Sequence, residues 1–245
     1  MKIIGIIPAR YASSRFPGKP LADIGGKSMI QRVYEQVKGC ASLAEVVVAT
    51  DDQRIEEHVR SFAGNVIMTS TEHESGTDRC AEVVSKINGF DVAINIQGDE
   101  PFINPLQIDL LCSLFNDPKT DIGTLIKKID KQEDLFSENT PKVIVGSEQQ
   151  ALYFSRQTIP FLRGIPNAEW LRKHNFYKHI GVYGYKTAVL QEITRLPISS
   201  LEKAEALEQL RWLENGYRIR VAETAYDTVA VDRPEDLETI KRTFF

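Results

Sequence analysis

The sequence of 245 residues predicts an α/β fold in which a mainly parallel sheet is flanked by helices and carries a smaller antiparallel portion. Through the first half, short β-branched runs alternate with segments of helical period, which is typical of a parallel sheet wrapped by helices. The alternation stops after about residue 121, where strand-like runs at 121–129, 142–146 and 151–156 follow one another without helical periods between them. We therefore expect one domain, 1–245, with the antiparallel portion at about 121–185.

The elements of the first half are predicted from apolar runs and capping residues. Ser28 and Gln31 predict a capping box at the start of a helix whose apolar face begins at Met29. Asp51 or Asp52 can cap the second helix. Further along, Gly64 is expected to end the second helix, a third helix follows Thr77, and Asn104 with Pro105 opens a fourth. The expected strands lie at 3–7, 46–50, 65–69 and 91–96.

In the second half, the turn-like stretch 147–150 predicts a hairpin between two of the strand-like runs. The stretch 201–215 is predicted to be one continuous helix that Gly216 stops. The remaining expected elements are a strand at 180–185, a helix at about 187–195, a strand at 217–223 and a helix at 234–245.

The composition, with 42% hydrophobic and 26% charged residues, is that of a globular protein with a sizeable core. The net charge of -4 argues against a nucleic-acid binder, which needs an excess of Lys and Arg. The apolar runs are too short to span a membrane and the N-terminus does not follow the signal-peptide pattern, so we expect a cytoplasmic protein. Cys40, Cys80 and Cys112 are widely spaced and are expected to be core thiols.

Three cations, Arg10, Arg15 and Lys19, follow the first strand in a loop that has no acidic residue before Asp23. Ligands of open parallel sheets bind beyond the carboxyl ends of the strands, and this loop begins at such an end. Because neighbouring cations repel one another, a multiply charged anion such as a nucleoside triphosphate would explain the loop. The alternative is a solvated basic turn.

The familiar phosphate-binding motifs do not occur in this loop. Ser13 and Pro20 stand where a P-loop requires Gly and then Ser or Thr, and the sequence contains no G-x-G-x-x-G. Kinase-like and dehydrogenase interpretations are therefore disfavoured.

A second stretch, INIQGDEPFI (94–103), places Asp99 and Glu100 at the end of another buried strand, with Gly98 letting the backbone turn tightly. Mg²⁺ is typically held by one or two carboxylates together with phosphate oxygens, so Asp99 facing a basic loop predicts a metal-nucleotide site. For Glu100, an acidic surface turn is the alternative. Asp232 is either a further metal ligand or the N-cap of a helix that starts near Pro234.

With these residues assembled, the chain closely resembles the 3-deoxy-manno-octulosonate cytidylyltransferases, the CMP-Kdo synthetases of bacterial lipopolysaccharide assembly. The resemblance covers essentially the whole length. It rests on seven motifs in order, namely IPARYASSRFPGKPL (7–21), HESGTDR (73–79), NIQGDEPFI (95–103), ALYFSR (151–156), KHIGVYGY (178–185), LEQLR (207–211) and VDRPEDL (231–237).

The resemblance implies a Rossmann-like nucleotide-binding fold, a smaller antiparallel portion used for dimerisation, and a homodimer. It also implies Mg²⁺-dependent transfer of CMP from CTP to 3-deoxy-manno-octulosonate (Kdo). Arg10, Lys19 and Asp99 are the implied catalytic residues, and Asp99 and Asp232 the implied metal ligands. The implied nucleotide-binding residues are Pro8, Ala9, Arg10, Ser13, Arg15, Lys19, His73, Ser75, Gly76, Arg79 and Gln97. The implied sugar-binding residues are Gln97, Arg156, His179, Tyr183, Glu208 and Gln209.

Alternatives remain open for the substrate and for some residues. In the sialic-acid cytidylyltransferases, the first loop has Gly and Lys where this chain has residues 11–14. These enzymes are therefore the second choice for the family that the chain resembles. The sugar is Kdo, an amino-substituted Kdo or another relative, because one pocket contact can discriminate a substituent.

His179 and Tyr183 share a strand face and are alternatively core residues, and Glu208 is alternatively part of a solvated helix face. Arg233 stands where a Thr is common, beside a predicted metal ligand. A nucleotide sensor without chemistry would dispense with the sugar-side residues, which this chain retains.

Overall fold

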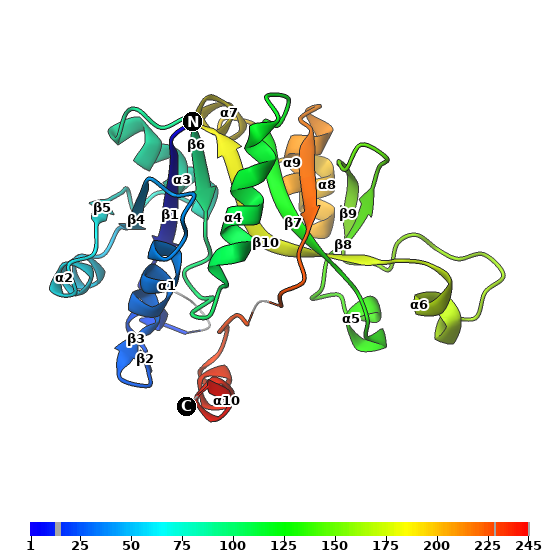
Figure 1. Ribbon diagram of the computed structural model, residues 1–245, viewed down its shortest axis with the longest axis horizontal. Helices are drawn as coiled ribbons and strands as arrows, with labels where there is room; N and C mark the ends of the chain where they lie inside the picture. The colour runs from blue at the N-terminus through cyan, green and yellow to red at the C-terminus, as the bar shows by residue number, and fades with distance from the viewer. Residues whose placement is uncertain (13–15, 228, 245) are drawn as a thin grey trace.

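A mixed sheet forms the centre of the computed structural model, which describes residues 1–12, 16–227 and 229–244 (Figure 1). Its strands lie in the order β11-β7-β10-β6-β1-β4-β5. Neighbours in this series pair in parallel except β10, which runs antiparallel between β6 and β7. The strands are β1 (Ile3–Ala9), β4 (Glu45–Thr50), β5 (Val66–Met68), β6 (Val92–Asn95), β7 (Ile122–Lys128), β10 (Tyr177–Lys186) and β11 (Ile219–Glu223). The predicted α/β class, with a mainly parallel sheet, is confirmed.

Helices cover both faces of the sheet. In Figure 1, α1 and α4 lie in front of the strands, and α7, α8 and α9 lie behind them. The helices are α1 (Met29–Lys38), α2 (Gln53–Ser61), α3 (Gly76–Lys86), α4 (Pro105–Ser113), α7 (Thr187–Ile193), α8 (Ser200–Glu205), α9 (Gln209–Glu214) and α10 (Pro234–Phe244). Short 3-10 helices occur at Lys19–Leu21, Leu114–Asn116 and Asn167–Glu169.

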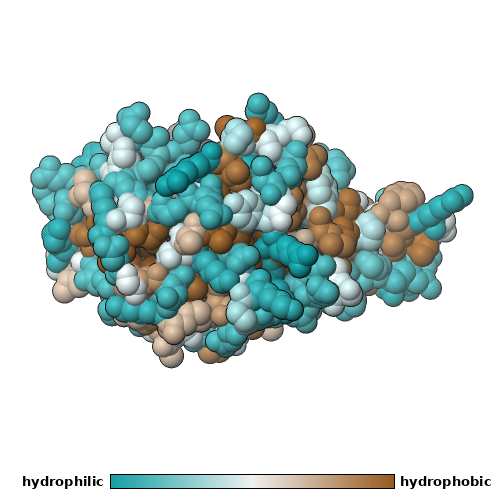
Figure 2. All heavy atoms as spheres, turned by 90° about the horizontal axis from the view of Figure 1, so that it is seen from above, coloured by the Kyte–Doolittle hydropathy of each residue, from teal (hydrophilic) through white to brown (hydrophobic). Residues whose placement is uncertain are grey.

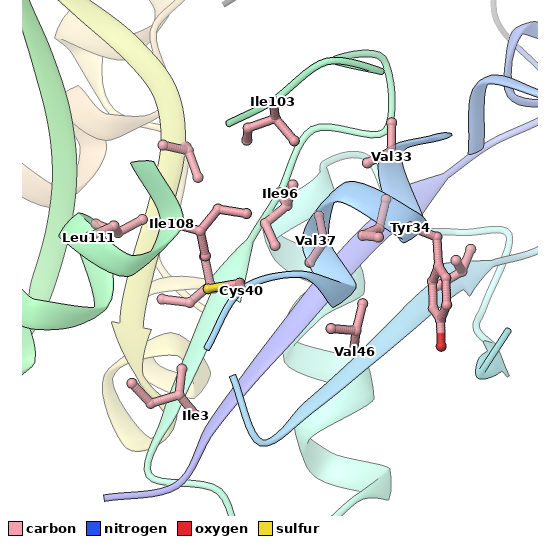
Figure 3. Close-up of a cluster of buried hydrophobic side chains, with 14 of the residues drawn as sticks. Ile3, Val33, Tyr34, Val37, Cys40, Val46, Ile96, Ile103, Ile108 and Leu111 are labelled. Carbon is pink, nitrogen blue, oxygen red and sulfur yellow. The ribbon is translucent and has the colours of Figure 1, made fainter. Parts of the chain in front are cut away.

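The core on the α1 and α4 side joins these helices to β1, β4 and β6 (Figure 3). Val37 of α1 and Ile108 of α4 are fully buried, and Ile96 lies between the two helices at the end of β6. Burying one such side chain contributes about 1.5–3 kcal/mol. The strand ends that carry the candidate site are therefore held by tightly packed side chains.

An arm extends from one side of the sheet, at the right of Figure 1. It contains α5 (Gln132–Phe136), β8 (Lys142–Val145), β9 (Ala151–Ser155) and α6 (Trp170–Lys173). β8 pairs antiparallel with β9 and with the first residues of β10, so the predicted hairpin is confirmed. The arm was predicted without a helix, because α5 has only five residues and is too short to show a helical period. The predicted subregion 121–185 also includes β7 and β10, which belong to the main sheet.

The prediction of one continuous helix over 201–215 is wrong. α8 ends at Glu205, Ala206 adopts the left-handed conformation with φ of 50°, and α9 begins at Gln209. The carbonyl oxygens of Glu205 and Ala206 accept hydrogen bonds from the guanidinium of Arg156, which is distant in sequence. This contact satisfies the carbonyls at the break, and the helical period carries no sign of it.

Most predicted helix ends are confirmed. Ser28 caps α1 and Asn104 caps α4, each by accepting a backbone N–H, and Gly216 has the expected positive φ. The capping box at α1 is only half formed, because the side chain of Gln31 donates to Glu35 and not to the backbone of Ser28.

Two further helix ends differ from the prediction. The left-handed residue after α2 is Ala63, and not Gly64. Gly64 is needed for space, because a Cβ there would lie 2.7 Å from a methyl carbon of Val59. The third helix begins at Gly76, one residue before Thr77.

The C-terminal segment returns to the first half of the chain. α10 packs beside the small ribbon of β2 (Asp23–Ile24) and β3 (Lys27–Ser28), on the side opposite the N-terminus in Figure 1. Ile24, Val231 and Ile240 form a small buried cluster there. This packing brings residues 231–232 to the carboxyl edge of the sheet. None of the helices in the described ranges is long and apolar enough to cross a membrane.

Candidate active site

A cleft of about 560 Å³ opens where β1 and β6 end, at the carboxyl edge of the parallel strands. Ligands of such sheets bind at this edge, so the cleft lies where the first loop was predicted to receive a nucleotide. Its lining residues are Pro8, Ala9, Arg10, Ala12, Lys19, Pro20, Glu74, Gln97, Gly98 and Asp99. Glu74 was not singled out from the sequence, although it lies within the 73–79 motif.

Gly98 allows the loop after β6 to approach the end of β1. A Cβ at this position would lie 2.6 Å from the carbonyl oxygen of Pro8, a distance that would force the two backbones apart. The glycine is therefore required for close approach, whereas the sequence suggested a tight turn. The approach brings Asp99 against the first loop.

Lys19 joins three segments that are far apart in the sequence. Its ammonium donates to the carboxylate of Asp99 over 2.7 Å and to the carbonyl oxygen of Val231 over 2.9 Å. A carboxylate oxygen of Asp232 lies 3.9 Å from the same ammonium. The N–H of Val231 donates to the carbonyl of Asp99 over 2.9 Å, which fixes the last two segments to each other. The predicted catalytic lysine and the two predicted metal ligands thus converge.

The start of α10 is where Asp232 was alternatively predicted to act as the N-cap of a helix. The carboxylate of Asp236 accepts hydrogen bonds from the backbone N–H groups of Asp232 and Arg233, each over 2.8 Å. Asp236 is the third residue of α10, and these bonds are those of a helix residue that reaches back to the N–H groups before the helix, not those of an N-cap side chain. Both roles of Asp232, as metal ligand and as N-cap, therefore stay predictions.

Glu100 is buried, so the alternative of an acidic surface turn is wrong for this residue. Its side chain is only 5% exposed, next to Asp99. Burial and the charge of Asp99 raise the pKa of Glu100 to about 7. The two adjacent acids therefore differ in character, and Asp99 is the one that faces the cleft.

Arg10 lies between the first strand and the 73–79 motif. Its guanidinium donates to the carbonyl oxygen of His73. Burial and the nearby cation Arg79 lower the pKa of Arg10, but an arginine stays charged at neutral pH. Ser13 and Arg15, which were also predicted to hold phosphate, lie outside the described residues.

The N-terminus of α3 faces the end of β1. Ser75 caps the helix in a full capping box with Asp78. A Cβ on Gly76 would lie 3.4 Å from the ring of Pro8, so the first turn of α3 borders the cleft. The exposed N–H groups and partial positive charge of a helix N-terminus favour an anion or a polar acceptor.

Arg79, predicted to bind the nucleotide, is held inside the protein. It is fully buried and donates to the carboxylate of Asp51 over 2.7 Å and to the hydroxyl of Thr69. This ion pair ties α3 to the ends of β4 and β5. The neighbouring Asp52 is the residue that caps α2, which resolves the choice left open by the sequence. A contact between Arg79 and the nucleotide stays a prediction.

β10 is irregular beside the cleft. Its register with β7 shifts between Ile180 and Tyr183, and the carbonyl of Gly181 accepts a hydrogen bond from the side chain of Gln97 over 2.8 Å. The hydroxyl of Thr124 donates to the carbonyl of Val182 over 2.7 Å. Gln97 thereby connects the loop after β6 to the strand that carries two predicted sugar residues.

His179 and Tyr183 lie side by side on β10, with ring centroids 5.1 Å apart. A ring nitrogen of His179 is 3.0 Å from the hydroxyl of Thr124, and Phe154 contacts the ring edge-on. Burial lowers the pKa of His179 to about 3, so its imidazole is neutral at pH 7. The Tyr183 hydroxyl is buried and has no hydrogen-bond partner among the residues that the structure describes.

The break before α9 places Glu208 against the first turn of α3. The hydroxyl of Thr77 donates to the Glu208 carboxylate over 2.8 Å, and burial raises the pKa of this group. A solvated helix face is therefore the wrong interpretation for Glu208. Gln209 is buried, and its amide nitrogen lacks a hydrogen-bond partner within the described ranges. Glu208 lines a hollow of about 900 Å³ beside α3 together with Ser75.

Arg156 lies at the junction of the arm and the α8–α9 break. Its guanidinium donates to the carbonyl oxygens of Glu205, Ala206 and Glu138, over 2.7, 3.2 and 3.0 Å. All three acceptors are neutral carbonyls, so the Arg156 contacts differ from the surface ion pair that is the usual role of such a residue.

Comparison with known proteins identifies the class to which the fold and the site belong. A family model described as "Cytidylyltransferase" matches residues 4–219, so this chain is a nucleotidyltransferase. A relative from Parabacteroides distasonis, 58% identical over 97% of this chain and 96% of its own length, is a 3-deoxy-manno-octulosonate cytidylyltransferase. A second, from Bacteroides thetaiotaomicron, is 57% identical over 97% and 96% of the two chains and has the same name. The chain belongs to the 3-deoxy-manno-octulosonate cytidylyltransferase family.

A solved structure agrees with this assignment. It is that of a CMP:2-keto-3-deoxy-manno-octonic acid synthetase complexed with CTP, which is 46% identical to this chain. The two structures match with a TM-score of 0.92 over 99% of this chain and 98% of the other.

Proposed function

We propose that the protein transfers CMP from CTP to Kdo, forming CMP-Kdo and pyrophosphate and so activating Kdo for lipopolysaccharide synthesis. The observation that carries this proposal is the convergence of Lys19, Asp99 and Asp232 beside the Arg10 cleft. A cation and two carboxylates at one strand edge suit a triphosphate with its metal. The family of the chain supplies the choice of CTP and Kdo.

In the proposed reaction, the anomeric hydroxyl of Kdo attacks the α-phosphorus of CTP in line and pyrophosphate leaves. Arg10 and Lys19 would bind the triphosphate and meet the negative charge that grows on the departing phosphates. The N-terminal turn of α3, with Ser75 and Gly76, would lie by the cytosine. Arg10 and the first turn of α3 are held by hydrogen bonds before the substrate arrives, which is the condition for effective electrostatic stabilisation.

Asp99 and Asp232 are the residues that would hold Mg²⁺. Their carboxylates are the oxygen donors that this ion takes, and both lie near the ammonium of Lys19, which marks a place for a positive charge between them. When bound, Mg²⁺ would neutralise charge on the phosphates. Lys19 would then turn from Asp99 toward the β- and γ-phosphates.

The sugar would be held on the far side of the cleft from the triphosphate. Arg156 would grip the carboxylate of Kdo through charge-assisted hydrogen bonds. Tyr183 and Gln209 each have a buried polar atom without a partner in the described part of the chain, and a sugar hydroxyl would satisfy either. Gln97, His179 and Glu208 complete the proposed set.

We also propose that the enzyme is a cytoplasmic homodimer formed through the arm. Phe161 and Leu152, 73% and 54% exposed, are large apolar side chains of the arm, and hydrophobic residues gather there in Figure 2. Exposed apolar patches of this kind mark protein contacts. Three free, buried cysteines suit a reducing compartment such as the cytoplasm. Light scattering with and without Phe161→Ser would test the dimer, which we expect the variant to weaken.

Pyrophosphate release from CTP in the presence of Mg²⁺ tests the proposed reaction. We expect release with Kdo, and much less with sialic acid. Relatives at 54–58% identity are named for Kdo, which leaves sialic acid without support. An amino-substituted Kdo belongs in the same panel, at fixed CTP. A protein that binds CTP but releases no pyrophosphate with any of these sugars would be a nucleotide sensor, and the proposal would fail.

A further inference from the structure

The most deeply buried ammonium of the arm belongs to Lys142 on β8. Its side chain is fully buried and donates to the carbonyl oxygens of Ser137 and Arg156, over 2.8 and 2.5 Å. Within the described residues, both acceptors are neutral. Burial lowers the pKa of Lys142 and the charge of Arg156 lowers it further, whereas the carboxylates of Glu205 and Glu138 act in the opposite direction. A buried ammonium that donates only to neutral carbonyl oxygens is costly even with carboxylates nearby, so its position calls for an explanation beyond packing.

Glu205 holds Arg156 from the opposite side. Its carboxylate accepts the backbone N–H of Arg156 over 2.9 Å and the hydroxyl of Ser155 over 2.6 Å. The ammonium of Lys142 donates a hydrogen bond to the backbone carbonyl of Arg156. The guanidinium of Arg156 donates to three other carbonyl oxygens. The main chain and side chain of Arg156 are therefore fixed at both ends.

The same contacts leave the charge of Arg156 available. The guanidinium donates to carbonyl oxygens and to no carboxylate, so it keeps a positive charge that can attract an anion, and Lys142 adds a second positive charge that offsets the nearby carboxylate of Glu205. The carbonyls of Glu205 and Ala206 lie at the break that leads directly to Glu208. An orientation imposed on Arg156 is thereby also imposed on the turn that carries the other sugar-side residues.

We propose that Lys142 is a positioning residue for the sugar acid, acting with Glu205 to hold Arg156 ready for the carboxylate of the substrate. This inference rests on the proposed function. Lys142 does not touch the substrate and acts only through Arg156. The buried charge is kept because it fixes one orientation of the arginine, which reduces the entropy lost when the carboxylate binds.

The test uses Lys142→Met, Arg156→Met and the double variant, with Lys186→Met as the matched control. Lys186 also donates to a carbonyl oxygen, that of Pro118 over 2.7 Å, but at the other end of the sheet. Steady-state kinetics give the KM for Kdo and for CTP separately, and thermal melting gives the stability. We expect Lys142→Met to raise the KM for Kdo by roughly tenfold, equivalent to about 1.4 kcal/mol, with the KM for CTP within twofold. Lys186→Met should leave both constants unchanged.

The double variant separates positioning from direct binding. If Lys142 acts through Arg156, its replacement should raise the KM for Kdo less than twofold once Arg156 is already Met. Equal effects of Lys142→Met in both backgrounds, or a rise in both KM values together, would overturn the inference. Should Lys142→Met fail to fold, Glu205→Gln is measured by the same criterion. A wild-type protein that releases no pyrophosphate with Kdo would overturn the proposed function itself. If the wild type is active and the variants keep its KM for Kdo, only this inference is overturned.

Discussion

The ammonium of Lys19 lies 2.7 Å from the carboxylate of Asp99, although the two residues are 80 positions apart in the chain. The contact joins the basic first loop to the acidic loop after β6. It brings the two motifs together at the edge of the sheet where we propose that Mg²⁺ and the triphosphate bind. The first two predictions concern this pair.

Asp99→Asn should reduce turnover by about 10³-fold, which corresponds to about 4 kcal/mol of transition-state stabilisation. The amide keeps the shape of the side chain but is a poor ligand for Mg²⁺, and Asp99 lies in an open cleft where the change does not disturb the core. Initial rates of pyrophosphate release across a Mg²⁺ titration measure the loss. Asp121→Asn is the control, because Asp121 also pairs with a lysine, Lys186, over 2.8 Å. Near-normal turnover at saturating Mg²⁺ would exclude Asp99 as a metal ligand.

Lys19→Met should lower kcat by roughly 10²-fold and raise the KM for CTP by less than tenfold. Charge builds up on the β- and γ-phosphates as pyrophosphate departs, so a point charge there matters more in the transition state than in the ground state. Separate determination of kcat and of CTP affinity distinguishes the two effects. A collapse of affinity at an unchanged maximal rate would make Lys19 a binding residue only.

Two adjacent aspartates should differ in their effect on stability. Asp51→Ala leaves the fully buried Arg79 without its carboxylate, and removing one partner of a buried pair costs about 3–5 kcal/mol. Asp52→Ala removes the N-cap of α2 and should cost about 1 kcal/mol. Urea unfolding of both variants gives the comparison. Equal losses would mean that the Asp51–Arg79 pair contributes no more than a helix cap.

His179 should make stability fall with decreasing pH. Its pKa is about 3 in the folded protein and about 6.5 in an unfolded chain, so the unfolded state binds more protons between these values. The free energy of unfolding therefore decreases as the pH falls below about 6.5, by at most about 1.4 kcal/mol per pH unit from this group.

In His179→Gln, this part of the pH dependence should be missing. Urea unfolding at pH 7, 5.5 and 4.5 measures it as the difference in slope from the wild type. His174→Gln, at an exposed position, is the control and should keep the wild-type slope. A parallel decline in wild type and His179→Gln would show that His179 takes up a proton in the folded state as well.

The parts of the fold that depend on local pattern were predictable from the sequence. The alternating strands and helices of the first half and the caps at Ser28 and Asn104 are set by neighbouring residues. The break at Ala206 was not predictable, because Arg156 stabilises it from 50 positions away. The burial of Glu100 was missed for the same kind of reason, since its surroundings are set by tertiary contacts.

For the site, the sequence predicted which motifs meet but not how they meet. The strand-end rule was enough to place Arg10, Lys19 and Asp99 at one edge of the sheet. The contact of Lys19 with the carbonyl of Val231 depends on the return of the C-terminal segment, which no local pattern encodes. Lys142 was missed because an isolated lysine in a strand is normally solvent-exposed.

β10 runs without interruption from the arm into the main sheet and pairs with strands of both. Its first residues, Tyr177 and Lys178, are bonded to β8 in the arm, and its last four, from Tyr183 onward, are bonded to β6 beside the cleft. The irregular stretch at Gly181 lies between these two supports and holds the side chain of Gln97. The contact of Gln97 with β10 therefore lies between the part of the strand that pairs with the arm and the part that pairs with β6. Because β10 also carries the proposed sugar-binding residues His179 and Tyr183, we expect that the arm cannot be exchanged as an independent module without changing their positions.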